Sequence, residues 1–170
     1  MAGRRIMQVM RRTLALLTAA AATVVLAATP AAAGTVSTDY VCNSGSIVSF
    51  PATYLTTITA PATVVQGETA TVRIEYTGVV PWHSDTPAGT YAGHGGFMLG
   101  GAATGLVKAP GLANPAIRAG EVMRFVGASA QVTFPNKGQV TFTPDRFYYR
   151  AACILRGSGP AGVAATTNVL

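Results

Sequence analysis

The chain has 170 residues and a formal net charge of +6, and only 11% of its residues are charged. Four of the 12 basic residues and none of the six acidic residues precede position 34, which leaves eight basic against six acidic side chains in the rest. Those eight are scattered along the sequence, which argues against a nucleic-acid-binding surface. Residues 34–170 suffice for one domain with a hydrophobic core.

Residues 1–33 have the three parts of a secretory signal peptide. Four arginines between positions 4 and 12 precede an uncharged run over 13–29, which ends in Pro30–Ala33. A basic segment, an apolar segment and small residues at the cleavage site are typical of export signals. The Ala-rich run is weakly hydrophobic for the alternative, a retained membrane anchor. We expect cleavage after Ala33 and a secreted or envelope-associated protein with no stable membrane span.

Cys42 and Cys153 are the only cysteines. An exported chain enters an oxidising compartment, where an even number of cysteines predicts disulfide bonding. We therefore predict a Cys42–Cys153 bridge that ties the first strand to one of the last.

Short runs rich in Thr, Val, Tyr and Phe alternate with Gly and Pro after position 34, a pattern typical of strands and turns. The clearest run is Thr69–Thr77, where apolar and polar residues alternate and predict an antiparallel strand with one solvated face. In Phe147–Leu155 the same period predicts that Cys153 points inward. Further strands are predicted over 35–42, 46–50, 54–60, 96–99, 121–126, 130–134, 138–143 and 162–169, with a brief helix over 113–118.

Residues 81–120 are rich in Pro and Gly and predict a long irregular loop with one strand inside. Of these ten candidate runs we expect roughly seven to nine to form short strands, in a single domain over 34–170. This favours an all-β, antiparallel immunoglobulin-like β-sandwich with one disulfide. The alternative is a small β-barrel.

Three segments resemble the uncharacterised secreted immunoglobulin-like domains common in high-GC bacteria. They are Tyr40–Cys42 behind the signal peptide, Pro61–Gly67 before the alternating strand, and the late strand Tyr148–Cys153. The chain departs from antibody-type domains, because Ala151 stands where those have a corner tyrosine and Cys42 falls in the first strand. The resemblance implies a sandwich and no particular activity.

Candidate chemistry is concentrated in 81–120, which holds both histidines. His83, Asp85 and His94 are candidate metal ligands or hydrolase residues, because His and Asp are common ligands of transition metals. Their spacing matches no metal motif, and no catalytic set or cofactor motif is present in the sequence. We therefore predict no cofactor.

Trp82, Tyr148 and Arg150 are candidate binding residues. Trp82 closes one end of the core or anchors a ligand, and Tyr and Arg are enriched at interfaces. These features favour a non-enzymatic binding or structural module whose partner is a protein, an envelope component or a small ligand. The alternative is a small metal-binding protein or hydrolase that uses His83, Asp85 and His94.

Overall fold

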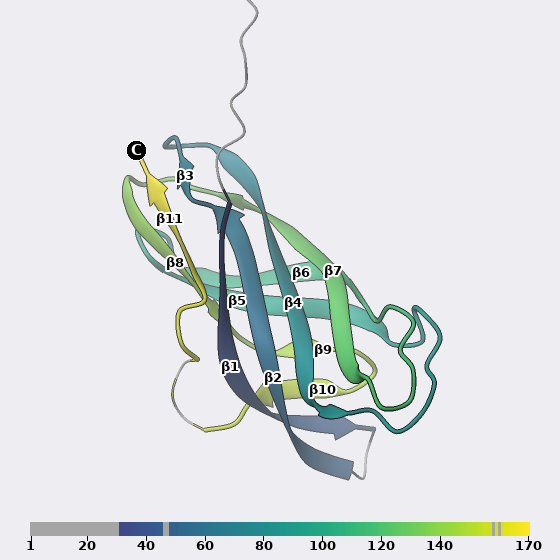
Figure 1. The fold of residues 1–170 in the computed structure, drawn as a ribbon. Coiled ribbons are helices and arrows are strands. Elements are labelled where there is room, and N and C mark those ends of the chain that lie inside the picture. Colours follow the sequence, from purple (N-terminus) through teal and green to yellow (C-terminus); the bar gives the residue numbers. More distant parts are fainter. Residues whose placement is uncertain (1–30, 46–47, 158, 160) are drawn as a thin grey trace, which may run out of the picture.

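A computed structural model describes residues 31–45, 48–157, 159 and 161–170, and its ordered elements are all strands. They are β1 (Ala31–Ser44), β2 (Val48–Pro61), β3 (Thr63–Val64), β4 (Thr69–Pro81), β5 (Ala92–Gly101), β6 (Gly105–Ala113), β7 (Val122–Thr133), β8 (Gly138–Pro144), β9 (Phe147–Tyr148), β10 (Ala152–Leu155) and β11 (Ala165–Val169) (Figure 1).

Eight of these strands close into a barrel in the order β5-β6-β7-β4-β2-β1-β10-β9. The closing contact pairs His94 of β5 with Tyr148 of β9. Further along β5, Phe97–Gly101 pair with β8, which continues the sheet to β11 and β3. Only the β3–β11 pairing is parallel among the described strands. The barrel is the architecture expected as the alternative, and the immunoglobulin-like sandwich stays a prediction.

The alternating sequence of β4 determines which of its side chains enter the barrel. Val72, Ile74 and Tyr76 are fully buried, whereas Thr71 and Arg73, which alternate with them, are exposed. The period of two predicted for this strand is confirmed, because successive side chains of a strand point to opposite faces. The strand continues past Thr77 to Pro81, four residues beyond its predicted end.

Pro51 and Gly127 misled the assignment of strand boundaries. The separate strands predicted over 46–50 and 54–60 are one strand, β2, which contains Pro51. Proline is tolerated there because β2 pairs with β4 only over Tyr54–Thr59, so one side of Pro51 has no strand neighbour within the described chain. Likewise, the strands predicted over 121–126 and 130–134 are one strand, β7.

The prediction of a long irregular loop over 81–120 is wrong. Two strands, β5 and β6, lie within it and pair with each other antiparallel. Glycine and proline weaken local strand propensity, but here the pairing of the two strands overrides it. The brief helix predicted over 113–118 does not form either, and Ile117 instead bridges to Thr86.

The single strand predicted over Phe147–Leu155 is a hairpin of β9 and β10. The chain reverses at Tyr149–Ala151, where Arg150 has a φ of 76° and the Tyr149 N–H donates to the Ala151 carbonyl. Phe147 and Cys153 are both buried and face each other across the hairpin. The inward direction predicted for Cys153 is confirmed, since the apolar alternation continues through the turn.

The centre of the barrel is aromatic, and Phe147 contacts most of it. Its ring stacks on Tyr76 with 4.1 Å between centroids, and it meets Tyr40 and Tyr54 edge-on at 5.0 and 5.2 Å. Stacked and edge-to-face aromatic pairs each add about 0.5–1.5 kcal/mol beyond the burial of their area. A two-residue strand is thus held by rings from β1, β2 and β4.

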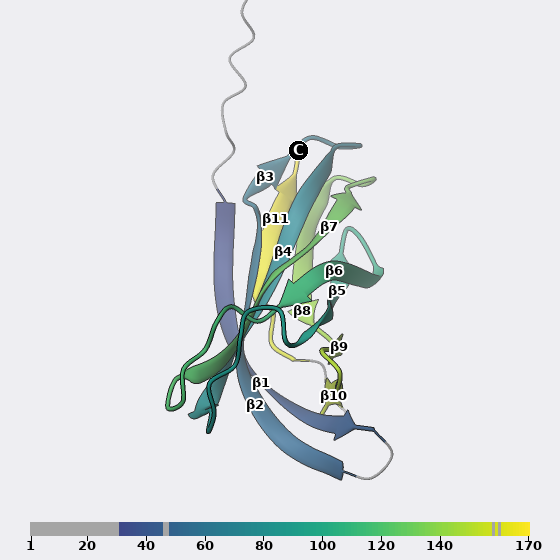
Figure 2. The same ribbon diagram turned by 90° about the vertical axis from the view of Figure 1, so that its right-hand side faces the viewer.

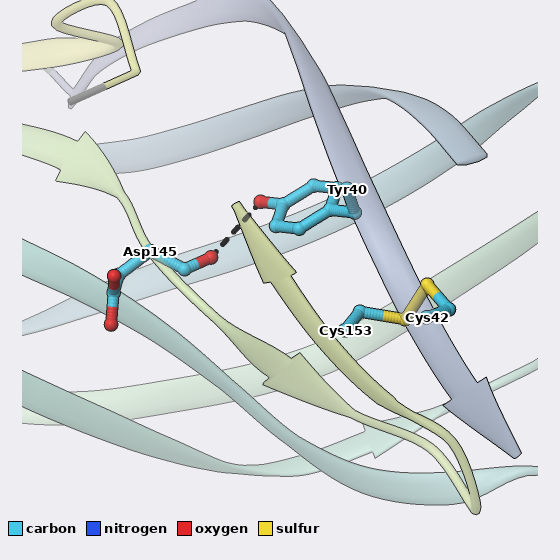
Figure 3. The surroundings of a disulfide bond; sticks show 4 residues. All are labelled: Tyr40, Cys42, Asp145 and Cys153. Carbon is cyan, nitrogen blue, oxygen red and sulfur yellow. Dashed lines mark hydrogen bonds between the residues drawn. A yellow bond between two sulfur atoms is a disulfide. The ribbon is translucent and has the colours of Figure 1, made fainter. Parts of the chain in front are cut away.

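The predicted Cys42–Cys153 disulfide is present and joins β1 to β10 across 111 residues of sequence. The two cysteines are directly paired in neighbouring strands. Two residues earlier in β1, the Tyr40 hydroxyl donates to the Asp145 carbonyl oxygen at 3.0 Å (Figure 3). Burial raises the pKa of Tyr40 well above its usual range, so this hydroxyl keeps its proton and can donate even in alkaline solution.

The predicted signal peptide lies mostly outside the described residues. Ala31–Ala33, its last three positions, are the first residues of β1 and pair with Thr59–Pro61. In the part of the chain that the structure describes, there is no helix of the length and apolarity that crossing a bilayer requires. The disulfide is a feature of oxidising compartments, in accord with the expected extracellular environment.

Replacing both cysteines, Cys42→Ala with Cys153→Ala, should lower the free energy of unfolding by about 2–4 kcal/mol, because the long loop is no longer constrained in the unfolded chain. Urea denaturation under oxidising conditions measures this loss. Reductant should lower the stability of the wild type to that of the variant and leave the variant unchanged. A wild type that keeps its full stability in reductant would contradict the prediction.

Gly93→Ala tests the closure between β5 and β9. A Cβ at Gly93 would collide with the Tyr148 carbonyl oxygen, and overpacking of this kind costs about 1–3 kcal/mol. The matched control is Gly162→Ala, whose Cβ would lie 3.4 Å from the nearest Val36 carbon, an ordinary contact. Thermal unfolding should show a lower midpoint for Gly93→Ala alone. Equal midpoints for the two variants would show that the seam is not tightly packed.

Candidate functional site

A groove of about 320 Å³ opens where β2 and β4 separate. It is lined by Phe50–Tyr54 of β2, by Gly78–His83 at and beyond the end of β4, by Met123 of β7 and by Tyr149 of the β9–β10 turn. This volume lies at the small end of the range for ligand pockets. We refer to these residues as the groove.

One side of the groove forms where the regular pairing of β4 with β7 is interrupted. Thr77 pairs with Arg124 of β7 and the next pair is Pro81 with Val122, so three residues of β4 oppose one of β7. A bulge of this kind re-aims side chains at the end of a strand. As a result, Val80 is 70% exposed although it lies in a strand.

Trp82 continues this side of the groove, and contacts with Thr86 and Tyr91 fix its side chain. Its indole Nε1–H donates to the Thr86 hydroxyl at 2.9 Å, and its ring meets Tyr91 edge-on at 6.2 Å. The Trp82 backbone N–H donates to the Glu121 carbonyl. The side chain is half-buried, so it offers a fixed aromatic surface to the groove.

The base of the groove belongs to the aromatic core. Tyr54 is only 5% exposed and Tyr149 is half-buried, and both rings contact Phe147. Burial raises the pKa of both tyrosines, that of Tyr54 well above its usual range. Both hydroxyls therefore stay neutral even in mildly alkaline solution.

The groove is suited to an uncharged ligand. Among the described residues, those that line it include no Lys, Arg, Asp or Glu. An apolar ligand would gain about 25 cal/mol for each Å² of apolar surface that leaves water, whereas an ionised ligand would find no carboxylate, ammonium or guanidinium group in this lining.

The structure separates the three candidate metal ligands. His83 lines the groove. The Asp85 carboxylate instead accepts the Ala119 N–H at 2.8 Å, and His94 stacks on Tyr148 at the barrel seam. No group of three His, Cys, Asp or Glu side chains suited to a metal occurs within the described ranges. The metal-binding alternative stays a prediction without a geometric basis.

Of the three candidate binding residues, only Trp82 lines the groove. Tyr148 and Arg150 are exposed, and Tyr148 lies against His94. Tyr149, the residue between them, is the one that reaches the groove. The sequence reasoning missed the groove residues on β2, because nothing local marks where β2 and β4 part.

His94 should titrate below its ordinary pKa of about 6.5. Partial burial lowers its pKa, and the nearby Lys108 cation lowers it further. The unfolded chain then binds a proton more readily than the folded one, so the contribution of His94 to stability falls as pH decreases through and below about 6.5. An NMR titration measures the titration midpoint of His94. Lys108→Met removes the nearby cation and should raise this midpoint part of the way towards the ordinary value. A wild-type midpoint at or above 6.5 would refute this assignment.

Comparison of the chain with protein-family models, curated proteins and solved structures found no match. The case for a function therefore rests on the geometry and chemistry of the groove.

Proposed function

We propose that this protein is a secreted, non-enzymatic binding module whose groove takes an uncharged, largely apolar ligand. The observation that carries the proposal is the exposed apolar and aromatic lining without a formal charge, with Val80 and Trp82 on one side. Large apolar side chains that remain exposed together mark interaction sites. The ligand belongs to a protein, an envelope component or a small molecule.

Secretion is supported by the disulfide and by the pattern of residues 1–33. The Cys42–Cys153 bridge is of the kind that persists in oxidising compartments. It lies in β1 and β10, beside the turn that supplies Tyr149 to the groove. The alternative of a metal-dependent or hydrolytic function has no specific observation in its favour.

The proposal is tested with the neutral apolar dye N-phenyl-1-naphthylamine and the oxidised protein. Trp82 is the only tryptophan in the chain and lines the groove, so its emission reports occupancy directly. Val80→Asp should weaken dye binding about tenfold or more, because the new carboxylate would have to be desolvated next to the ligand. Fluorescence titration gives both dissociation constants.

Leu106→Asp on β6 is the matched control. Leu106 is 51% exposed and does not line the groove, so the same negative charge replaces an exposed aliphatic side chain elsewhere on the surface. The control should bind dye as the wild type does. No dye binding by the wild type, or equal weakening in both variants, would overturn the proposed function.

A further inference from the structure

Beside the groove, β2 has an edge that no other strand of the described residues pairs with. Along its whole length β2 pairs with β1, but it pairs with β4 only over Tyr54–Thr59. Within the described chain, Val48–Thr53 therefore has no strand neighbour on its other side. Alternate residues of a strand direct their N–H and C=O groups to opposite neighbours, so this stretch presents hydrogen-bonding groups to the open side.

The gap beside this edge is a fork between two diverging strands. Val79 and Val80 bulge away from β7 at the end of β4. The paired ends of β1 and β2 curve away from the end of β4 and towards β10 (Figure 2). The groove lies in this fork, because Phe50–Tyr54 line one side of it and Gly78–His83 the other.

We propose that the groove binds an extended, uncharged segment of a partner polypeptide, which adds as a strand to the open edge of β2 at Phe50–Thr53. Strand addition satisfies the backbone groups of an open edge, while alternate side chains of the added segment enter pockets and give specificity. Here those side chains would meet Trp82 and Tyr54. This inference rests on the proposed function and specifies its ligand.

An extended chain fits the fork better than the edge of another folded sheet. Residues 79–83 face β2 across the groove, where a second sheet would need room for its next strand. A single strand occupies about 4.8 Å of sheet width and needs no such room. The absence of Lys, Arg, Asp and Glu among the described groove residues favours uncharged inward side chains in the segment.

Pro51 restricts how the segment pairs. It has no N–H, so at that position the edge can only accept a hydrogen bond through the carbonyl. Prolines on edge strands suppress indiscriminate pairing. The proposed pairing is therefore short, with Thr53 supplying both a donor and an acceptor, and the apolar groove supplies much of the affinity.

The experiment begins with a phage-displayed library of random 12-residue peptides selected on the oxidised full chain. The most enriched peptide is synthesised with acetylated and amidated ends, and its dissociation constant is measured through Trp82 emission. Each of its amides is then N-methylated in turn, which removes one N–H at a time and leaves the protein unaltered. We expect losses of about tenfold or more at every second position and small effects between them.

Two further measurements tie the peptide to the groove. It should displace N-phenyl-1-naphthylamine, and Val80→Asp but not Leu106→Asp should weaken its binding. If the dye binds and no selected peptide displaces it, or if N-methylation shows no alternation, strand addition is overturned while the proposed function stands. If neither dye nor peptide binds the groove, the proposed function fails as well.

Discussion

The packing of Phe147 against its aromatic neighbours is the interaction on which the barrel depends. The ring belongs to β9, only two residues long, and it touches Tyr40, Tyr54 and Tyr76 from three long strands. Main-chain pairing over two residues holds a strand weakly, so burial of this ring fixes the position of β9. The seam between β5 and β9 follows from that position, because residue 148 is the partner of His94.

The same packing supports the groove. Tyr54 and Tyr149 form its base and both rest on Phe147, so the surface of the groove is one face of the core. Trp82 is fixed separately, by its hydrogen bond to Thr86. The site therefore combines a rigid base and a rigid side with one open strand edge. A pre-organised site of this kind loses little conformational entropy when it binds.

Local pattern in the sequence was sufficient for the all-β class, the disulfide and the inward face of β4, since each depends on neighbouring residues or on compartment chemistry. It was insufficient for β6. Pro110 and Gly111 weaken the local strand propensity of this segment, and only its pairing with β5 makes it a strand. The hairpin at Tyr149–Ala151 was not predicted either, because the alternation of buried and exposed residues continues through the turn as it would in one strand. The groove depends on where β2 and β4 diverge, which is a relation between distant segments, and only Trp82 and His83 were singled out beforehand.

The pairing of the first described strand with one of the last has a consequence for the order of folding. β1 has one early partner, β2, and its other partner, β10, lies more than a hundred residues further along the chain. Topologies dominated by such distant pairings fold slowly, because the entropy of closing the loop is lost before contacts compensate it. Until β10 arrives, the long β1–β2 hairpin carries an exposed edge that other chains could pair with. The cysteines lie directly opposite each other once β1 and β10 pair, so in the folded chain the disulfide secures this distant pairing.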